Sequence, residues 1–265
     1  GKPCNRQTPH SHNFLTQDGS TPQKITEIAR NQVAKYDTVK FYDGLAIGSK
    51  KVAKGFDVKT SRGDSFHTKK LILATGIKDL MPEIEGFAEC WGISVVHCPY
   101  CHGYEIRNKK TAIMANGDTA IHLASLVNNL SQDITILTEG KVSFDDQQLQ
   151  KLGQHGIKII EKEISAIEHK AGYLKNILFK DGSVEAFEAA YASIPFEQNT
   201  SIPDELGCKI TDQGYIEVDE MGKTAVDGVF ACGDCSTMMR SVATAVYNGN
   251  IAGVFINHEL TQESF

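Results

Sequence analysis

Residues 111–140, TAIMANGDTAIHLASLVNNLSQDITILTEG, decide the fold class of this chain. An apolar run at 111–114 leads into a short glycine-containing turn, then into a stretch with apolar residues at helical spacing, and a second apolar run fills 134–137. Short, wholly apolar runs are typical of strands that are buried on both faces of a parallel sheet. The stretch therefore predicts a strand, a turn, a helix and a second strand parallel to the first.

Similar patterns extend along the chain in both directions. The run LILA at 71–74 is apolar throughout, which predicts a buried strand that delivers the glycine turn Thr75-Gly76 to a site. Ser143, with Asp146 three residues later, predicts the cap of a helix that ends near residue 155. Further strands are predicted as a meander within 39–74 and at 157–160, 164–169, 173–180, 184–188 and 228–232, with further helices over about 22–36 and 241–260. Because strands alternate with helices, the fold class is α/β.

The composition limits the classes of function. The 265 residues include 27 Lys and Arg against 33 Asp and Glu, for a formal net charge of −6, and 41% are hydrophobic. That length allows one large domain or two modest ones with a sizeable core. Mild acidity without a dense basic block argues against a nucleic-acid partner. No apolar run approaches the ~20 residues of a membrane helix, and no apolar leader follows a basic start. We therefore expect a cytoplasmic protein that acts on small molecules or proteins, without a membrane.

The cysteines support two chemistries. Seven cysteines are an odd number over a long chain, which disfavours a secreted disulfide framework. Four of them form two CxxC pairs, Cys98 with Cys101 and Cys232 with Cys235, and such pairs suit either reversible oxidation or zinc. Cys232 follows Cys101 by 131 positions, far beyond the roughly 15–20 residues of a compact zinc ribbon. Zinc is therefore the weaker interpretation, and no metal site is expected.

The pair Cys98 and Cys101 has the spacing of a redox dithiol. Two intervening residues let the Cα atoms approach within the ~4.4–6.8 Å that a disulfide needs. A useful dithiol also needs one thiolate near neutral pH, and His102 could lower the pKa of a thiol as an imidazolium or shuttle its proton. The competing interpretations are a chance CxxC and a histidine that merely fills a loop.

The turn ANGDTA at 115–120 lies where a dinucleotide fold has its G-x-G-x-x-G/A motif. Ala115 replaces the first glycine, whereas Gly117 still permits close approach of the backbone to a ligand. Glu139 lies 22 positions after Gly117, near the place where an acid binds the ribose hydroxyls of NAD, and no arginine cluster follows to bind a 2′-phosphate. Weak NAD binding, a vestigial site without nicotinamide and a plain Rossmann-like scaffold all stay open.

Gly233 and Asp234 follow the apolar run at 228–232. A glycine and an acid at the carboxyl end of a buried strand are typical of a contact to the hydroxyl groups of a ligand.

Several motifs occur in one order along the chain, namely ATG at 74–76, CPYCHGYE at 98–105, GVFACGDCS at 228–236 and RSVATAVYNGNIAG at 240–253. This ordered set, with the degenerate turn at 115–120, resembles the low-molecular-weight thioredoxin reductase family over essentially the whole chain. It is most similar to the branch with a histidine after the cysteine pair, which includes gliotoxin-type dithiol oxidases and bacterial thioredoxin reductase-like proteins.

The resemblance implies an α/β flavoprotein with two Rossmann-like domains, each with three layers (ββα). A discontinuous FAD-binding domain is expected at 1–103 and 201–265, and an NAD(P)-binding-like domain at 104–200. The implied function is a thiol-disulfide oxidoreductase that passes electrons between FAD and a CxxC disulfide, with NAD(P)H as second cofactor if the degenerate turn binds it. The alternatives are a dithiol oxidase that uses oxygen and an inactive binding or scaffold relative. The implied partners are a thioredoxin-like protein or a small disulfide or dithiol, and the implied assembly is a homodimer.

The resemblance also implies roles for single residues. Cys101 matches the flavin-proximal thiol and Cys98 the interchange thiol that attacks the disulfide of the partner. His102 stands where classical members have an acid, which makes it the candidate proton donor to the leaving thiolate. The residues implied for FAD are Asn13, Thr75, Gly76, Gly233, Asp234, Arg240, Ser241 and Val242, and those implied for NAD(P) are Gly117, Asp118, Thr119 and Glu139.

Three departures from the family pattern limit this transfer. The G-x-G-x-x-G motif that binds the FAD pyrophosphate in other members occurs nowhere in the 265 residues, so we expect an amino-terminally truncated form with weakened FAD affinity. Thr138-Glu139-Gly140 replaces the arginine cluster for NADPH, so NADH, another donor or an oxidase reaction is expected. Pro195 replaces a glycine turn, fixes φ and is expected to restrict domain rotation.

Overall fold

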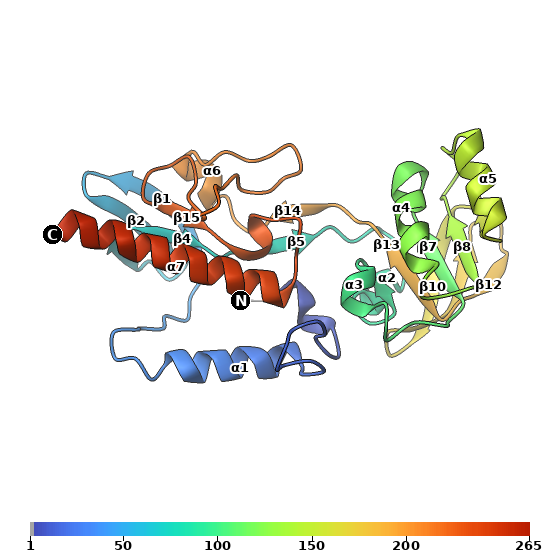
Figure 1. The fold of residues 1–265 in the computed structure, drawn as a ribbon, viewed down its shortest axis with the longest axis horizontal. Helices are drawn as coiled ribbons and strands as arrows, with labels where there is room; N and C mark the ends of the chain where they lie inside the picture. Colours follow the sequence, from blue (N-terminus) through green and yellow to red (C-terminus); the bar gives the residue numbers. More distant parts are fainter. Residues whose placement is uncertain (1–2) are drawn as a thin grey trace. The chain divides into compact units, whose positions relative to one another are not determined.

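The computed structural model describes residues 3–265, and their contacts divide the chain into two compact units (Figure 1). Unit 1 comprises the residues up to Cys4, Thr26–Asp79 and Phe196–Phe265, and unit 2 comprises Asn5–Ile25 and Leu80–Pro195. The sequence placed the boundaries at 103/104 and 200/201, whereas the contacts change unit at 79/80 and 195/196. The pair Cys98 and Cys101 therefore belongs to unit 2.

Unit 2 is built on a five-stranded parallel sheet in the order β6-β13-β7-β8-β9. These strands are β6 (Val95–Val96), β7 (Thr111–Met114), β8 (Ile134–Leu137), β9 (Lys158–Ile160) and β13 (Ala189–Ala192). Helix α4 (Gly117–Val127) connects β7 to β8, and every residue of these two strands is buried. The predicted strand–turn–helix–strand unit is confirmed.

The two faces of this sheet are covered by different elements. Ala112 and Met114 of β7 belong to a core shared with Ile167 and Leu174 of an antiparallel sheet. That sheet consists of β10 (Ile164–Lys170), β11 (Tyr173–Phe179) and β12 (Val184–Ala186). Ile113 points to the opposite face and packs under α4 and α5 (Asp146–Gln154). Alternating side chains therefore build two cores, and the predicted three-layer ββα arrangement is confirmed for unit 2.

The cap of α5 corrects one prediction. The N-cap is Asp145, whose side chain accepts the Gln148 N–H at 2.8 Å while Gln148 accepts the Asp145 N–H at 3.0 Å. The predicted Ser143 with Asp146 does not cap the helix, because the Ser143 N–H donates to Asn116 and holds that residue at the preceding turn. Gln148 also has the longer side chain that a reciprocal capping box needs.

Unit 1 holds three small sheets. The predicted meander is present as β1 (Ala46–Val52), β2 (Gly55–Thr60) and β3 (Ser65–Thr68), paired antiparallel. Strand β4 (Leu71–Leu73) pairs in parallel with β15 (Val229–Ala231), and β5 (Ile77–Asp79) pairs antiparallel with β14 (Phe196–Gln198). The remaining elements are η1 (Cys4–Gln7), α1 (Pro22–Val33), α2 (Phe87–Cys90), α3 (Pro99–His102), α6 (Ile202–Leu206), η2 (Gly233–Cys235) and α7 (Val242–Ser264). Of these, α2, α3 and most of η1 lie in unit 2, and α1 is divided between the units after Ile25.

Strand β4 is less buried than its apolar sequence predicts. Leu73 is 3% exposed, whereas Ile72 is 38% exposed. Successive side chains of a strand point to opposite faces, so Leu73 joins the core of unit 1 and Ile72 points away from it. The prediction of a strand buried throughout is wrong at Ile72. The glycine turn after the strand is present, and Gly76 has a φ of +63° that favours glycine.

Candidate functional site

The predicted redox pair lies at the start of the one-turn helix α3. Cys98 is its N-cap with extended backbone, Pro99 is its first residue, and Cys101 follows three positions after Cys98. The Cys101 N–H donates to the Cys98 carbonyl at 3.2 Å, which closes the turn. Residues three apart in such a turn lie on the same side, and both cysteines are partly buried. The fold therefore brings the two thiols together with limited access to solvent.

His102 ends the same helix and is partly buried. Its Nδ1 is buried and has no hydrogen-bond partner among residues 3–265. Burial lowers the pKa of His102, the charge of Glu105 raises it, and His12 lowers it again, with a net decrease. This direction favours the neutral imidazole, which can accept a proton, over the imidazolium.

Three further groups interact with His102 or with Cys98. Glu105 lies three residues after His102, and its N–H donates to the His102 carbonyl at 3.2 Å. The Nδ1 of His12 lies 3.5 Å from Glu105 Oε1. Tyr191 of β13 is 1% exposed, and burial, the Cys98 thiol and Glu105 all raise its pKa. Sequence reasoning gave no role to these three residues.

The dinucleotide-like turn lies between β7 and α4. Asn116 is the N-cap of α4, and its Oδ1 accepts the N–H groups of Gly117 at 2.8 Å and Ser143 at 2.9 Å. Its Nδ2 donates to the Lys141 carbonyl at 2.9 Å. Asp118 in the first turn of α4 accepts a hydrogen bond from Gln148 Nε2 at 2.8 Å. Hydrogen bonds of the Asn116 side chain therefore connect the loop after β8 to this turn.

Two other residues predicted for NAD(P) are Thr119, on α4, and Glu139, after β8. Thr119 is exposed in the first turn of α4. Glu139 follows β8 and has a φ of +52°. Burial raises the pKa of its carboxyl group, and the charge of Glu163 raises it further. Glu139 lines a recess of about 400 Å³ together with Met114 and the residues 192–195. The recess lies at the carboxyl ends of β7, β8 and β13, where open α/β sheets bind ligands.

Most residues predicted for FAD converge in unit 1. Leu73 and Ala231 are register partners in the parallel pair β4–β15, so Thr75-Gly76 and Gly233-Asp234 follow at the same sheet edge. Asn199 Nδ2 donates to the carbonyls of Thr75 and Ile77, both at 2.9 Å, and holds the first turn. Asn13 belongs to unit 2, so its contact with FAD stays a prediction.

Asp234 is the acid at this edge. The Cys4 Sγ donates to Asp234 Oδ2 at 3.3 Å. Burial raises the pKa of Asp234, while Cys4 and the charge of Arg240 lower it. Burial, then the charge of Asp234, raises the pKa of Cys4 to about 12, so this thiol is a donor and not a nucleophile. Arg240 Nη1 also lies 3.3 Å from Asp79 Oδ1, with both side chains mostly buried.

Arg240 precedes the long helix α7. Ser241 caps that helix, accepting the Thr244 N–H at 3.0 Å, and Val242 is its first residue. The start of a helix of 23 residues is a point of partial positive charge.

The comparison with known proteins identifies the family. The model for pyridine nucleotide-disulphide oxidoreductases matches residues 2–249, nearly the whole chain. The chain belongs to the pyridine nucleotide-disulphide oxidoreductase family. It is 30% identical over 272 residues to thioredoxin reductase sirT of Leptosphaeria maculans, covering 94% of this chain and 82% of that protein. It is 29% identical over 274 residues to thioredoxin reductase tcpT of Claviceps purpurea, covering 98% and 84%.

A solved structure agrees with this membership. The crystal structure of an oxidoreductase from Agrobacterium tumefaciens has a TM-score of 0.91 and 33% identity to this chain, covering 98% of this chain and 88% of that one. The resemblance to thioredoxin reductases that the motifs at 98–105 and 228–236 indicated is confirmed.

Membership in this oxidoreductase family implies FAD, and unit 1 fits it in part. Thr75 Oγ1 and Gln198 Oε1 are buried without a hydrogen-bond partner among the described residues. Gln198 Nε2 donates to the carbonyl of Cys235, the residue after Asp234, at 3.0 Å. Buried polar atoms without partners are rare unless a ligand or water pairs them. The residues at this edge therefore fit a hydroxylated ligand segment such as the ribityl chain of FAD.

The family also implies NAD(P)H, and the residues of the turn do not fit its pyrophosphate. Asn116 already takes the Gly117 N–H, which a phosphate oxygen would need. Asp118 places a negative charge at the helix start. The N–H group at the start of this turn is taken by the chain's own side chain.

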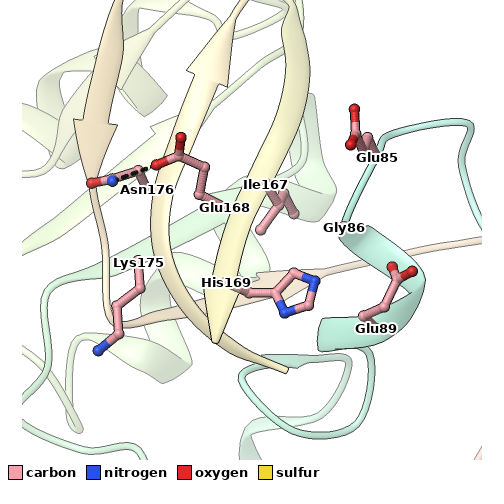
Figure 2. A pocket seen from close by; sticks show the side chains of 8 residues that line it. All are labelled: Glu85, Gly86, Glu89, Ile167, Glu168, His169, Lys175 and Asn176. Atoms are coloured by element: carbon pink, nitrogen blue, oxygen red, sulfur yellow. Dashed lines mark hydrogen bonds between the residues drawn. The ribbon is translucent and has the colours of Figure 1, made fainter. Parts of the chain in front are cut away.

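Unit 2 holds a second recess, away from the dinucleotide-like turn. The larger recess of unit 2, about 620 Å³, lies between the segment leading into α2 and the strands β10 and β11. Figure 2 shows Glu85 and Glu89 on one side and Glu168 and Lys175 on the other, with charged ends that do not meet. Between Pro3 and Phe265, no three or more His, Cys, Asp or Glu side chains are placed to hold a metal ion. In the same part of the chain, no helix is long and apolar enough to cross a membrane.

Proposed function

We propose that this chain is a thiol-disulfide oxidoreductase in which Cys98 and Cys101 alternate between a dithiol and a disulfide. The observation that supports this most directly is the single turn of helix that holds both thiols and a buried imidazole with an unpaired nitrogen. Rigid placement of a dithiol beside a proton carrier is what thiol–disulfide exchange requires.

The exchange proceeds in two steps. A thiolate of the partner dithiol attacks one sulfur of the Cys98–Cys101 disulfide, and the other cysteine leaves as a thiolate. The second partner thiol then attacks the mixed disulfide, so the partner leaves as a disulfide and the enzyme holds two thiols. Two electrons pass to the enzyme, and the two protons lost by the partner are taken up by the cysteines. The neutral imidazole of His102 takes the proton of the attacking thiol and passes it to the leaving thiolate.

We propose that unit 1 binds the flavin. FAD, when bound, exchanges two electrons with the dithiol. Thr75, Gly76, Gly233 and Asp234 hold its hydroxylated chain, because they share one sheet edge with buried polar atoms that lack partners. The start of α7, with Arg240, Ser241 and Val242, provides positive charge that stabilises the reduced ring.

A dithiol titration tests this function. The protein is reconstituted with FAD and mixed with dithiothreitol without oxygen, and loss of the yellow flavin absorbance is expected. Cys101→Ser is expected to abolish the bleaching. Cys208→Ser, at a buried thiol of unit 1 that bonds Thr224 at 3.8 Å, is the control and is expected to bleach as the wild type does. Unchanged bleaching in Cys101→Ser overturns the mechanism, and failure to bind FAD at all supports an inactive scaffold.

A second candidate is a dithiol oxidase, and the occupied turn at Asn116 favours it. If no nicotinamide supplies electrons, a partner dithiol and oxygen give the partner disulfide and hydrogen peroxide. Oxygen consumption distinguishes the two directions. We expect consumption with a small dithiol alone and none with NADH or NADPH alone. Rapid oxidation of NADPH coupled to reduction of a disulfide would instead support the reductase with a thioredoxin-like or small disulfide partner.

The proposed assembly rests on the resemblance, and the proposed location rests on the composition. We propose a homodimer of the cytoplasm, and the mass of the protein in solution by light scattering tests the first of these.

A further inference from the structure

The recess of about 400 Å³ in unit 2 has an almost wholly apolar lining. Its volume lies within the range of about 300–1,000 Å³ that small-molecule sites occupy. Every residue that lines it is apolar except Glu139 and Ser193. Phe87 and Met114, which are 1% and 8% exposed, belong to a packed core as well as to the recess. The recess therefore offers a ligand an apolar surface that the fold holds in place.

Two segments of the chain contribute much of this lining. Residues 80–82 lie where the chain enters unit 2 after β5, and residues 193–195 lie where it leaves toward β14. The Leu80 N–H donates to the Pro195 carbonyl at 2.8 Å, which joins the two segments. A site whose walls are joined before a ligand arrives spends less free energy on ordering them.

Glu139 supplies the charge of the recess. Among the described residues that line it, Glu139 alone is charged. Its φ of +52° is uncommon for a residue other than glycine, and such backbone strain gathers at ligand sites. The carboxylate has no hydrogen bond or ion pair with residues 3–265. The charges of Glu163 and Lys180 act on it, but Lys180 Nζ is paired with Glu163 Oε2 at 2.5 Å. The carboxylate is therefore open to a ligand.

These features select the chemistry of the ligand. A phosphate or carboxylate group would meet Glu139 with no lysine or arginine in the lining to pair with, and juxtaposed like charges are costly. A positively charged group would gain a charge-assisted hydrogen bond from Glu139. The thioether groups of Met81 and Met114 favour contacts with aromatic rings. The lining thus fits an aromatic ring that carries a positive charge.

We propose that this recess binds an aromatic molecule with one amine or amidine group, with the ring against Met81 and Met114 and the positive charge at Glu139. The competing occupant is a nicotinamide dinucleotide, because the recess lies at the sheet edge where Rossmann folds bind one. Its pyrophosphate is the kind of group that the recess gives no cation. The inference goes beyond the proposed function, since it requires neither FAD nor a dithiol.

The methionines of the chain provide the assay. Met81 and Met114 line the recess, whereas the other three, Met221, Met238 and Met239, belong to unit 1 and serve as internal controls. The full chain is labelled with ¹³C at the methionine methyl groups, and the NMR signals are assigned from Met81→Leu and Met114→Leu. It is then titrated with 2-naphthylmethylammonium, with the neutral 2-naphthylmethanol and with the anion 2-naphthoate.

The three probes share one ring and differ in charge. We expect the ammonium probe to shift the signals of Met81 and Met114, and the three methionines of unit 1 to stay unchanged. The ammonium probe is expected to bind at least ~10-fold more tightly than the neutral probe, because hydrogen bonds to charged groups exceed neutral ones by such a factor. No binding of 2-naphthoate is expected.

A matched pair of variants tests the role of the acid. Glu139→Gln is expected to weaken binding of the ammonium probe roughly 10-fold and to leave the neutral probe unchanged. Glu83→Gln is the control, because Glu83 is exposed between two lining residues and does not itself line the recess. It is expected to change the affinity less than ~2-fold. Fluorescence of Trp91, the single tryptophan and a residue of unit 2, checks that each variant folds.

Three results overturn the proposal. They are unshifted signals of Met81 and Met114, equal affinities of the ammonium and neutral probes, and equal losses in Glu139→Gln and Glu83→Gln. Shifts of the same two signals by NADH at lower concentrations than by the ammonium probe would assign the recess to a nucleotide, which also overturns it. If Glu139→Gln does not fold, the three probes on the unchanged chain decide. None of these measurements uses flavin or a dithiol, so the proposed function and this site fail independently.

Discussion

Replacement of Lys70 by methionine tests whether buried ion pairs hold α7 on unit 1. Lys70 Nζ lies 2.8 Å from Glu259 Oε2 and 2.5 Å from Glu263 Oε1, and only 7% of the lysine side chain is exposed. Glu259 also pairs with Lys223. Since both glutamates belong to α7, these pairs connect the end of that helix to the residue before β4.

The expected loss of stability depends on the charges that the substitution leaves without a partner. Removal of one partner of a buried ion pair costs about 3–5 kcal/mol when the other charge stays buried and unpaired. Here Glu259 keeps Lys223 and Glu263 is 49% exposed, so we expect a lower cost of about 2 kcal/mol. Lys78→Met is the matched control. Lys78 Nζ lies 2.7 Å from Glu197 Oε1, but the two side chains are 63% and 51% exposed. Loss of this exposed pair should lower the free energy of unfolding by less than ~0.5 kcal/mol.

The dependence on pH has a definite sign. Hydrogen bonds from Lys223 and Lys70 lower the pKa of Glu259 below 4.5, so its contribution is complete above pH 4.5 and is lost as the pH falls through the lowered value. Burial lowers the pKa of Lys70, but its two glutamates raise it above 10.5 overall, so its contribution is lost only at higher pH. Urea unfolding followed by circular dichroism at pH 7 and pH 3 measures the cost of the substitution and its decrease in acid. Equal destabilisation by Lys70→Met and Lys78→Met at pH 7 would refute the reasoning.

Two further perturbations test the fold and the nucleotide turn. Gly86→Ala is expected to destabilise unit 2 by ~3 kcal/mol or more in urea unfolding, because its Cβ would lie 2.1 Å from the Ile167 carbonyl oxygen at a φ of +80°. Gly182→Ala, with φ +82° and open space, is expected to cost only about 1–2 kcal/mol, and equal costs would contradict the steric argument. Asn116→Gly with Asp118→Ser is expected to tighten NADH binding at least ~10-fold by calorimetry, since it frees a donor and removes a charge. An unchanged affinity would show that these two residues do not block the turn.

Prediction of the fold from the sequence worked best where the local hydrophobic pattern and burial in the folded protein require the same residue types. The runs at 111–114 and 134–137 are apolar because both faces of the parallel sheet are covered, so the pattern alone identifies strands β7 and β8. The juxtaposition of the candidate dithiol and His102 could also be predicted, because Cys98, Cys101 and His102 are neighbours in the chain and one turn of helix suffices to bring them together.

Prediction failed where a contact depends on residues far apart in the chain. Glu105 meets His12 across a loop with no periodicity, so no local pattern indicates the pair. Ser143 has the residue type of a cap, but a hydrogen bond to Asn116, 27 positions earlier, holds it elsewhere. Ile72 is as apolar as its neighbours, and only the pairing of β4 with β15 decides which side chain turns to the core.

The turn at Asn116 shows why family membership does not by itself assign the electron donor. A phosphate oxygen and an amide oxygen accept the same N–H groups at a helix start, so one asparagine side chain can replace a ligand there. The Oδ1 of Asn116 accepts two N–H groups, those of Gly117 and Ser143. The sulfur chemistry proposed at α3 depends on none of these bonds. In the proposed oxidase, the Rossmann-like scaffold of unit 2 supports the dithiol while its nucleotide turn is filled, and the electrons come from the thiol partner.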